Sequence, residues 1–242
     1  MCYFSSISVG FKIIETRFGA RFVQSEQFKP VYSASAFTFP RLPVITSENP
    51  DQIDLFNWGL IPFWIKDETA AGQIKQQTIN ARAETVFVKP SFRHSAATKR
   101  CLVLVNGFFE WRHFEKQRYP YYIGLPDHEP FALAGIWDLW INRRTEEEIK
   151  TFSIITTQAN PLLEQIHNIK KRMPVVLSRE TERNWLYQRA DKKGLEALLK
   201  PYAAGRLNAF TVDRAISRLG LNTEHPAVLI PKEYAGLPAV KD

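Results

Sequence analysis

Short apolar runs, several of them alternating with polar residues, recur from Leu42 to Thr156. Such runs predict β-strands, because alternate side chains of a strand point to opposite faces of a sheet. The charged stretch 142–148 separates two of these runs and predicts the tip of a hairpin. We expect strands near Leu42–Thr46, Ile53–Trp58, Cys101–Val105, Tyr121–Leu125, Phe131–Trp137 and Ile149–Thr156.

Helical signals are fewer. Asn160 and Pro161 can begin a helix that runs toward His167, because Asn caps helices and Pro fits their first turn. Ser178 can cap a second helix, and Leu195–Leu199 continues as a short third one. Strands with helices inserted between them, without regular alternation, predict an α+β protein. With no repeat and no low-complexity linker, the chain reads as a single domain over residues 1–242.

Composition favours a folded protein in a reducing compartment. Hydrophobic residues make up 45% of the 242 residues, and aromatic residues 13%, which is enough for a packed core. The two cysteines, Cys2 and Cys101, form no disulfide framework. We see no signal peptide and no apolar run long enough to span a membrane, so we expect a cytoplasmic protein with no membrane partner. The histidines lack metal-ligand spacing, so we expect no metal and no cofactor.

The formal net charge is +7. A basic surface attracts polyanions, nucleic acid first, although many basic proteins bind nothing acidic. The basic residues are spread along the chain and form no basic tail, so charge alone leaves both interpretations open.

Cys2 is the first candidate for chemistry. Removal of Met1 would leave an α-amine and a thiol on adjacent carbons. Such an aminothiol condenses with an aldehyde to an imine, and the thiol then closes a thiazolidine ring. By itself, Cys2 is more simply the second residue of an ordinary chain.

Three further polar residues stand in unusual surroundings. Asn80 and Arg82 are two positions apart, which places both side chains on one face of an extended backbone. They could form a phosphate-binding site, or they could be solvated side chains of a surface strand. Glu110 lies between Phe109 and Trp111. Burial at this position would raise the pKa of Glu110, which suits a proton shuttle. Equally, Glu110 could face solvent at a strand edge or be the buried partner of an arginine.

His167 is the histidine that ends the first predicted helix. Histidine exchanges protons near neutral pH, but a lone histidine is more often structural.

Blocks of sequence along most of the chain resemble the SOS-response-associated peptidase (SRAP) family. No single block would suffice, but their order and spacing do. They are Met1-Cys2, Trp58–Trp64, Asn80–Thr85, Phe92-Arg93, Arg100–Val103, Gly107–Trp111, Phe131–Trp137, Phe152–Thr157, Ala159-Asn160 and Arg172–Val175.

The resemblance implies a mostly antiparallel, barrel-like or bifurcated β-sheet surrounded by helices, in one domain. It implies a monomer that binds single-stranded DNA, especially at junctions with duplex, and captures the aldehyde of an abasic site as a covalent cross-link. The protein would be cytoplasmic and associated with the nucleoid when bound to DNA. Removal of Met1 could be autocatalytic.

The resemblance also implies roles for particular residues. Cys2 would supply the amine and thiol, Asn80 would position the N-terminal residue, Glu110 would shuttle protons, and His167 would assist with the opened sugar. Other residues would contact the DNA strand. The phosphate-binding residues would be Arg82, Arg93 and Arg172, the DNA-facing residues of the early segment would be Phe37 and Pro40, and Trp58 would either stack on a base or pack in the core.

Two segments depart from the family pattern. The family's histidine stands two positions before the arginine of Arg-Met-Pro, whereas His167 stands five before Arg172. A local bulge could keep both side chains in place. The segment Tyr32–Arg41 also differs from the family's usual Asn followed by a proline turn.

Two other functions compete with the covalent sensor. The first is an N-terminal-nucleophile hydrolase in which Cys2 attacks an amide with Glu110 or His167 as base. The second is a noncatalytic single-strand-binding module in which the aminothiol is incidental.

Overall fold

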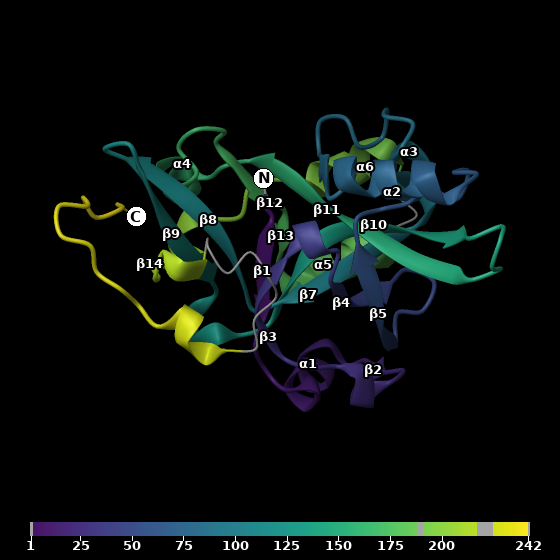
Figure 1. The fold of residues 1–242 in the computed structure, drawn as a ribbon, viewed down its shortest axis with the longest axis horizontal. Helices are drawn as coiled ribbons and strands as arrows, with labels where there is room; N and C mark the ends of the chain where they lie inside the picture. The colour runs from purple at the N-terminus through teal and green to yellow at the C-terminus, as the bar shows by residue number, and fades with distance from the viewer. Residues whose placement is uncertain (1, 188–190, 217–224, 242) are drawn as a thin grey trace.

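A computed structural model describes residues 2–187, 191–216 and 225–241. Five strands close on themselves as a barrel (Figure 1). Neighbouring strands are antiparallel except where β11 pairs with β5 in parallel, with Phe152 opposite Trp58. The barrel strands are β4 (Arg41–Thr46), β5 (Gln52–Trp58), β7 (Arg100–Val105), β10 (Phe131–Ile141) and β11 (Glu148–Gln158).

Four short strands extend the barrel. β6 pairs in parallel with β11, β12 pairs antiparallel with β11, β13 pairs with β10, and β2 pairs in parallel with β5. Their bounds are β2 (Arg21–Phe22), β6 (Asn80–Arg82), β12 (Arg172–Pro174) and β13 (Val176–Leu177).

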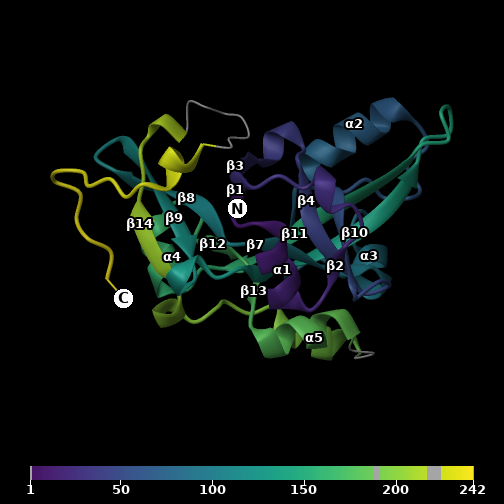
Figure 2. The same ribbon diagram turned by 90° about the horizontal axis from the view of Figure 1, so that it is seen from below.

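A second sheet of five antiparallel strands has the order β14-β9-β8-β1-β3. These strands are β1 (Phe4–Ile7), β3 (Val31–Ser35), β8 (Gly107–Phe114), β9 (Gln117–Gly124) and β14 (Asn208–Thr211). In the view from below, the N-terminal end of the chain lies between this sheet and the barrel (Figure 2).

Asn106 joins the two sheets, because it is the one residue between β7 and β8. It is fully buried. Its side-chain Oδ1 accepts from the Ser8 backbone N–H at 3.0 Å, and its carbonyl accepts from the Tyr122 hydroxyl at 2.8 Å. One hydrophobic cluster spans both sheets, so barrel and second sheet share a core.

Helices cover the outside of the sheets. They are α1 (Phe11–Phe18), α2 (Glu68–Gln77), α3 (Arg93–Thr98), α4 (Pro161–Ile166), α5 (Arg179–Tyr187) and α6 (Lys192–Leu198). Short 3-10 turns are η1 (Ser25–Gln27), η2 (Ala36–Thr38), η3 (Pro126–His128), η4 (Ala204–Arg206) and η5 (Pro226–Leu229). No helix within the described ranges combines the length and the apolar character that crossing a membrane requires.

The helix caps follow the sequence signals. The Asn160 side chain accepts from the Leu163 N–H at 2.8 Å, with Pro161 in the first turn of α4. The Ser178 hydroxyl accepts from the Thr181 N–H at 3.3 Å at the start of α5. Each bond satisfies a backbone donor that the first turn of a helix leaves without a partner.

The predicted α+β class and barrel-like sheet are confirmed. All six predicted strands are present, and β10 and β11 are longer than predicted because they continue into the 142–147 hairpin. The sequence patterns did not predict the other elements, most of which are short or carry mixed patterns: β1, β2, β3, β8, β12, β13, β14, α1, α2 and α3.

The C-terminal segment 225–241 lies along the second sheet. Tyr234, Leu237 and Val240 pack against the main hydrophobic cluster. The backbone of Lys241 exchanges two hydrogen bonds with the Gln165 side chain of α4, at 2.7 and 2.9 Å. The end of the described chain is therefore fixed to the helix that precedes His167.

Candidate active site around Cys2

Cys2 lies just before β1 and is fully buried. The pairing of β1 with β8 places Phe4 opposite Phe109, so the chain before Phe4 runs beside Glu110. Burial raises the pKa of the Cys2 thiol well above its usual range, and the charge of Glu110 raises it further. The thiol is therefore protonated at neutral pH in this state.

Asn80 begins β6 and reaches across to the N-terminal segment. Its Nδ2 donates to the Cys2 carbonyl oxygen at 2.8 Å. Its Oδ1 is buried and has no hydrogen-bond partner among the described residues. One end of the amide thus fixes Cys2, and the other end presents an acceptor inside the site.

Glu110 lies in β8 and is 4% exposed, as its flanking Phe109 and Trp111 predict. Burial raises the pKa of Glu110 to about 7. Near neutral pH both its acid and base forms are populated. A carboxyl group in this condition can donate and accept protons within one reaction, which suits a general acid–base role.

His167 follows α4 directly and contacts Glu110, with Nδ1 3.7 Å from Oε1. Its Nδ1 also lies 2.7 Å from the Arg172 carbonyl oxygen. A carbonyl only accepts, so Nδ1 carries the proton and Nε2 is the acceptor. Burial lowers the pKa of His167 to about 4, so the ring is neutral at pH 7 and its contact with Glu110 is not an ion pair.

The longer spacing between His167 and Arg172 is accommodated by a turn. The Lys171 N–H donates to the His167 carbonyl at 2.8 Å, and Lys171 has a left-handed φ of 47°. This turn accommodates the three additional residues while His167 lies beside Glu110.

The predicted phosphate-binding arginines differ in availability. Arg82 is exposed at the end of β6, two residues after Asn80. Arg93 is exposed at the first residue of α3, a helix packed on β7 and β10.

Arg172 is largely enclosed. Its guanidinium forms a two-pronged ion pair with Glu84, and Nη2 donates to the Thr156 carbonyl at 2.6 Å. Its side chain is 12% exposed. A phosphate would have to displace Glu84 to reach it.

Burial selects core packing over base stacking for Trp58 and corrects the predicted DNA contact of Pro40. Trp58 is fully buried, stacks on Phe152 with ring centroids 6.0 Å apart, and donates from Nε1 to the Ile79 carbonyl at 2.9 Å. It is a core residue and offers no face to a base. Pro40 is also buried, and its carbonyl accepts from the Trp58 N–H, so it makes no surface for DNA.

Phe37 is 60% exposed beside the N-terminal segment. Its ring stacks on Tyr3 with centroids 5.1 Å apart. Phe63 is 51% exposed and Trp64 is 44% exposed, both in the segment between β5 and α2. In the sequence block Trp58–Trp64, the exposed aromatic residues are therefore Phe63 and Trp64, and Trp58 is buried.

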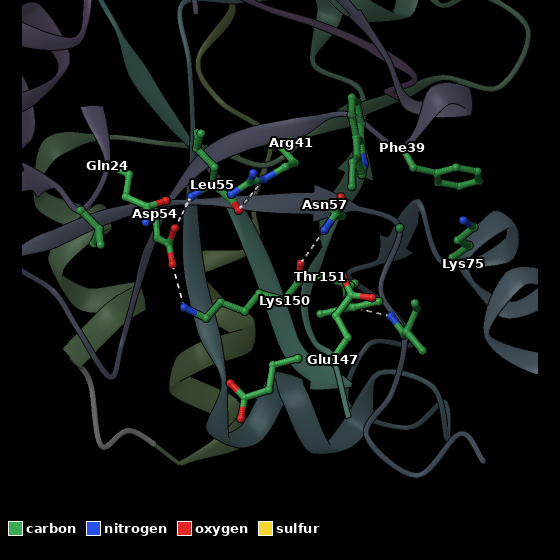
Figure 3. A pocket seen from close by; sticks show the side chains of 16 residues that line it. Gln24, Phe39, Arg41, Asp54, Leu55, Asn57, Lys75, Glu147, Lys150 and Thr151 are labelled. Atoms are coloured by element: carbon green, nitrogen blue, oxygen red, sulfur yellow. Dashed lines mark hydrogen bonds and ion pairs between the residues drawn. The ribbon is translucent and has the colours of Figure 1, made fainter. Parts of the chain in front are cut away.

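A separate cavity of about 640 Å³ lies between β4, β5, β11 and α2. Its wall mixes both signs of charge, including the Lys150–Asp54 ion pair, Arg41 and Lys75, whose ammonium lies 4.3 Å from the Phe39 ring centroid (Figure 3). None of Cys2, Asn80, Glu110 or His167 lines it. The cavity is thus distinct from the Cys2 site. In the part of the chain that the structure describes, no three His, Cys, Asp or Glu side chains gather as they would around a metal ion.

Residues 1–219 match the family described as SOS response associated peptidase (SRAP). The chain belongs to the SRAP family. SRAP proteins among its relatives include the Bacillus subtilis abasic site processing protein YoqW, which is 36% identical over 81% of this chain and 85% of YoqW. The Xenopus tropicalis abasic site processing protein HMCES is 28% identical over 67% of this chain and 55% of its own length.

Solved structures agree with the SRAP assignment. A crystal structure of a Bacteroides thetaiotaomicron protein superimposes with a TM-score of 0.89 and 39% identity, covering 96% of this chain and all of the other. A Bordetella bronchiseptica protein gives a TM-score of 0.75 at 25% identity, with 88% of this chain covered. The barrel and second sheet are therefore the architecture shared with these proteins.

Proposed function

We propose that the protein processes abasic sites in single-stranded DNA by forming a covalent cross-link through an N-terminal Cys2. The observation that carries the proposal is the grouping of Cys2, Asn80, Glu110 and His167 at one buried position, drawn from four separate parts of the chain. The names of the SRAP relatives, which describe abasic-site processing, support it.

The chemistry begins with the loss of Met1. Hydrolysis of the Met1–Cys2 peptide bond consumes one water and releases methionine, either through an aminopeptidase or through the protein's own site. The new α-amine has an ordinary pKa of about 7.7–8.0, so part of it is neutral at physiological pH. It adds to the aldehyde of the ring-opened abasic sugar and loses one water to give an imine.

The Cys2 thiol completes the reaction. Sulfur adds to the imine carbon, the thiol proton passes to nitrogen, and a thiazolidine ring forms, so aldehyde and aminothiol combine with the loss of one water overall. An imine at an abasic site promotes β-elimination and strand cleavage, and ring closure removes that imine. The raised pKa of the thiol favours this order, with amine attack first, because an iminium charge beside the sulfur would then favour the thiolate.

The neighbouring groups supply proton transfer and position. Glu110, with a pKa of about 7, delivers and removes protons as water leaves and the ring closes. Nε2 of His167 accepts from a sugar hydroxyl, and Asn80 holds the Cys2 carbonyl while its Oδ1 accepts from the amine or the sugar. Holding amine, thiol and aldehyde together replaces a slow encounter with effective molarities of roughly 10⁵ M or more.

Exposed residues around the site would bind the strand. Arg82 and Arg93 would contact phosphates, and Arg172 would contact a phosphate only after release from Glu84. Phe37 and Trp64 would stack on bases. One chain holds every group that the reaction uses, which fits a monomer acting at single-stranded DNA, at junctions with duplex and on the nucleoid. We also propose that the domain includes the segment 225–241, because its side chains pack in the same core.

A denaturing gel tests the proposal. The protein is incubated with a single strand that carries one abasic site, after mass spectrometry has established the N-terminal residue. A slower band is expected, with the mass of protein plus DNA minus one water. Cys2→Ala should abolish the band, and Cys101→Ala should keep it, since Cys101 is buried in the barrel. Absence of the band from protein with an N-terminal Cys2 would reject the proposal.

The same samples separate the competing functions. Hydrolysis of peptide or glutamine analogues without a DNA adduct would favour the N-terminal-nucleophile hydrolase. Salt-sensitive DNA binding that is indifferent to Cys2 would favour the noncatalytic module.

A further inference from the structure

The turn between His167 and Arg172 has a defined structure and no assigned role. Asn168 pins it to β8, because its Nδ2 donates to the His113 carbonyl at 2.8 Å and its Oδ1 accepts from the His113 N–H at 3.0 Å. β8 pairs with β1 only at residues 107–109. Farther along β8, the Asn168 side chain forms the two backbone hydrogen bonds at His113 that a neighbouring strand would otherwise form. At its other end, the Lys171 carbonyl accepts from the Ala159 N–H at 3.0 Å.

The residues at the tip of this turn point away from the fold. Ile169 is 65% exposed, the highest value among the large hydrophobic residues described. Lys170 and Lys171 are exposed beside it. Lys171 lies 4.0 Å from Glu164, whereas no ion pair or hydrogen bond among the described residues involves the Lys170 ammonium. A rigid turn therefore holds an apolar side chain and an uncompensated positive charge in solvent.

Lys170 stands three residues after His167, whose Nδ1 lies 3.7 Å from Glu110 Oε1. Burial raises the pKa of Glu110 and lowers that of His167, and the charge of Lys170 acts on both groups by favouring the ionised carboxylate and the neutral imidazole. A phosphate bound by Lys170 would thus lie next to the position that an abasic sugar must take at Cys2.

We propose that the turn Asn168–Lys171 is a DNA-contacting element, in which Lys170 binds a backbone phosphate beside the abasic nucleotide and Ile169 covers the apolar face of an adjoining sugar or base. The inference rests on the proposed function for the identity of the strand. Charge complementarity selects DNA over a protein as the occupant, because the tip carries two lysines and no acidic residue. The apolar side chain adds a contact of the kind that proteins place against bases.

The chain offers a matched control for this turn. Lys12 and Ile13 form the same exposed pair of residue types on α1, which lies away from α4 in both views (Figures 1 and 2). The double variants I169S/K170Q and K12Q/I13S make equal changes in charge and in apolar surface. Both leave Asn168 and its bonds to β8 in place, so thermal unfolding should be unchanged in each.

The experiment uses an undamaged fluorescent single strand, with affinity measured by anisotropy over a series of salt concentrations. I169S/K170Q should weaken binding by about 3- to 10-fold and reduce the slope of log K against log salt by about 0.7, the value for one phosphate contact on a single strand. K12Q/I13S should match wild type.

An affinity and a salt slope at the wild-type values in I169S/K170Q, while Arg82→Ala weakens binding, would overturn the inference and leave the proposed function standing. Failure of the wild-type protein to cross-link abasic DNA would reject the proposed function instead. Because the binding assay uses undamaged DNA, the two failures are distinguishable.

Discussion

Asn80 and Cys2 are joined by a 2.8 Å hydrogen bond from Nδ2 to the carbonyl oxygen, across 78 positions of sequence. β6 fixes the asparagine end of this bond through its parallel pairing with β11, in which Asn80 lies opposite Ile154. The barrel thereby sets the position of the residue that we propose as the reactive terminus.

Replacing Asn80 should slow covalent capture more than it weakens DNA binding. Asn80→Ala removes the bond to Cys2, and Asn80→Asp keeps the shape but loses the donor. Both should reduce the single-turnover cross-linking rate by about 10- to 100-fold, because misplacement of a reacting group by about 1 Å has effects of that size. Asn208→Ala, in the exposed first position of β14, provides the control. A wild-type rate in Asn80→Asp would show that the donor is not needed.

Glu110→Gln should separate proton transfer from binding. The amide keeps the size of the side chain but cannot exchange a proton, so cross-linking should fall by about 10²- to 10⁴-fold. Affinity for an undamaged strand should stay near wild type, since the side chain is buried. Rate measurements on a gel and anisotropy on the same preparation check both. Equal losses in rate and affinity would assign Glu110 a structural role.

Glu110 should also make stability depend on pH. Its pKa is about 7 in the folded protein and about 4.3 in an unfolded chain. Below the pKa of the unfolded chain, Glu110 is protonated in both the folded and the unfolded state, so its ionisation does not change the stability. As pH rises toward 7 only the unfolded state ionises, so stability is lost, and above pH 7 the loss is constant at about 4 kcal/mol.

Urea unfolding at pH 4 and pH 8 measures this effect. The stability of Glu110→Gln relative to wild type should be greater at pH 8 than at pH 4, because only the wild type loses stability as pH rises. Glu26→Gln removes an exposed carboxylate and controls for net charge. A stability difference between Glu110→Gln and wild type that does not change with pH would contradict the raised pKa.

Arg82→Ala should weaken binding to intact single strands as well as to abasic ones. Loss of one phosphate contact should lower the salt slope by about 0.7. Arg143→Ala removes the same charge at the exposed hairpin tip between β10 and β11 and should change neither quantity. An Arg82→Ala protein that binds like wild type yet fails to cross-link would exclude the phosphate-binding role.

Trp58 and Trp64 should respond in opposite ways to substitution. Trp58→Phe loses the bond from Nε1 to the Ile79 carbonyl and part of its core packing, so it should lower the free energy of unfolding by about 1–3 kcal/mol. Its DNA affinity should not change. Trp64→Ala should leave stability near wild type and weaken single-strand binding. Reduced affinity in a folded Trp58→Phe protein would restore a DNA role for Trp58.

Local patterns predicted much of this fold and site. The caps at Asn160 and Ser178 act within one helical turn, and the strands follow from their own apolar residues. The burial of Glu110 likewise follows from its two aromatic neighbours and the apolar strand before it. These features are fixed within a few residues of where they are read.

What the sequence did not predict depends on distant pairing. The sequence left the burial of Trp58 open and did not predict that of Pro40. Both are buried because β5 meets β11 in parallel and closes the barrel, a contact between segments more than ninety residues apart. The engagement of Arg172 by Glu84 requires β12 and the end of β6 to flank the same strand. A lone strand pattern contains no information about either partner.

Attachment of Lys241 to Gln165 has a practical consequence for handling the protein. An affinity tag at the front of the chain would block the amine on which the proposed capture depends, and one at the back would pull on the helix that leads to His167. The exposed hairpin tip at 143–147 is remote from both (Figure 1), so an internal tag there is the design that leaves the proposed reactive end native.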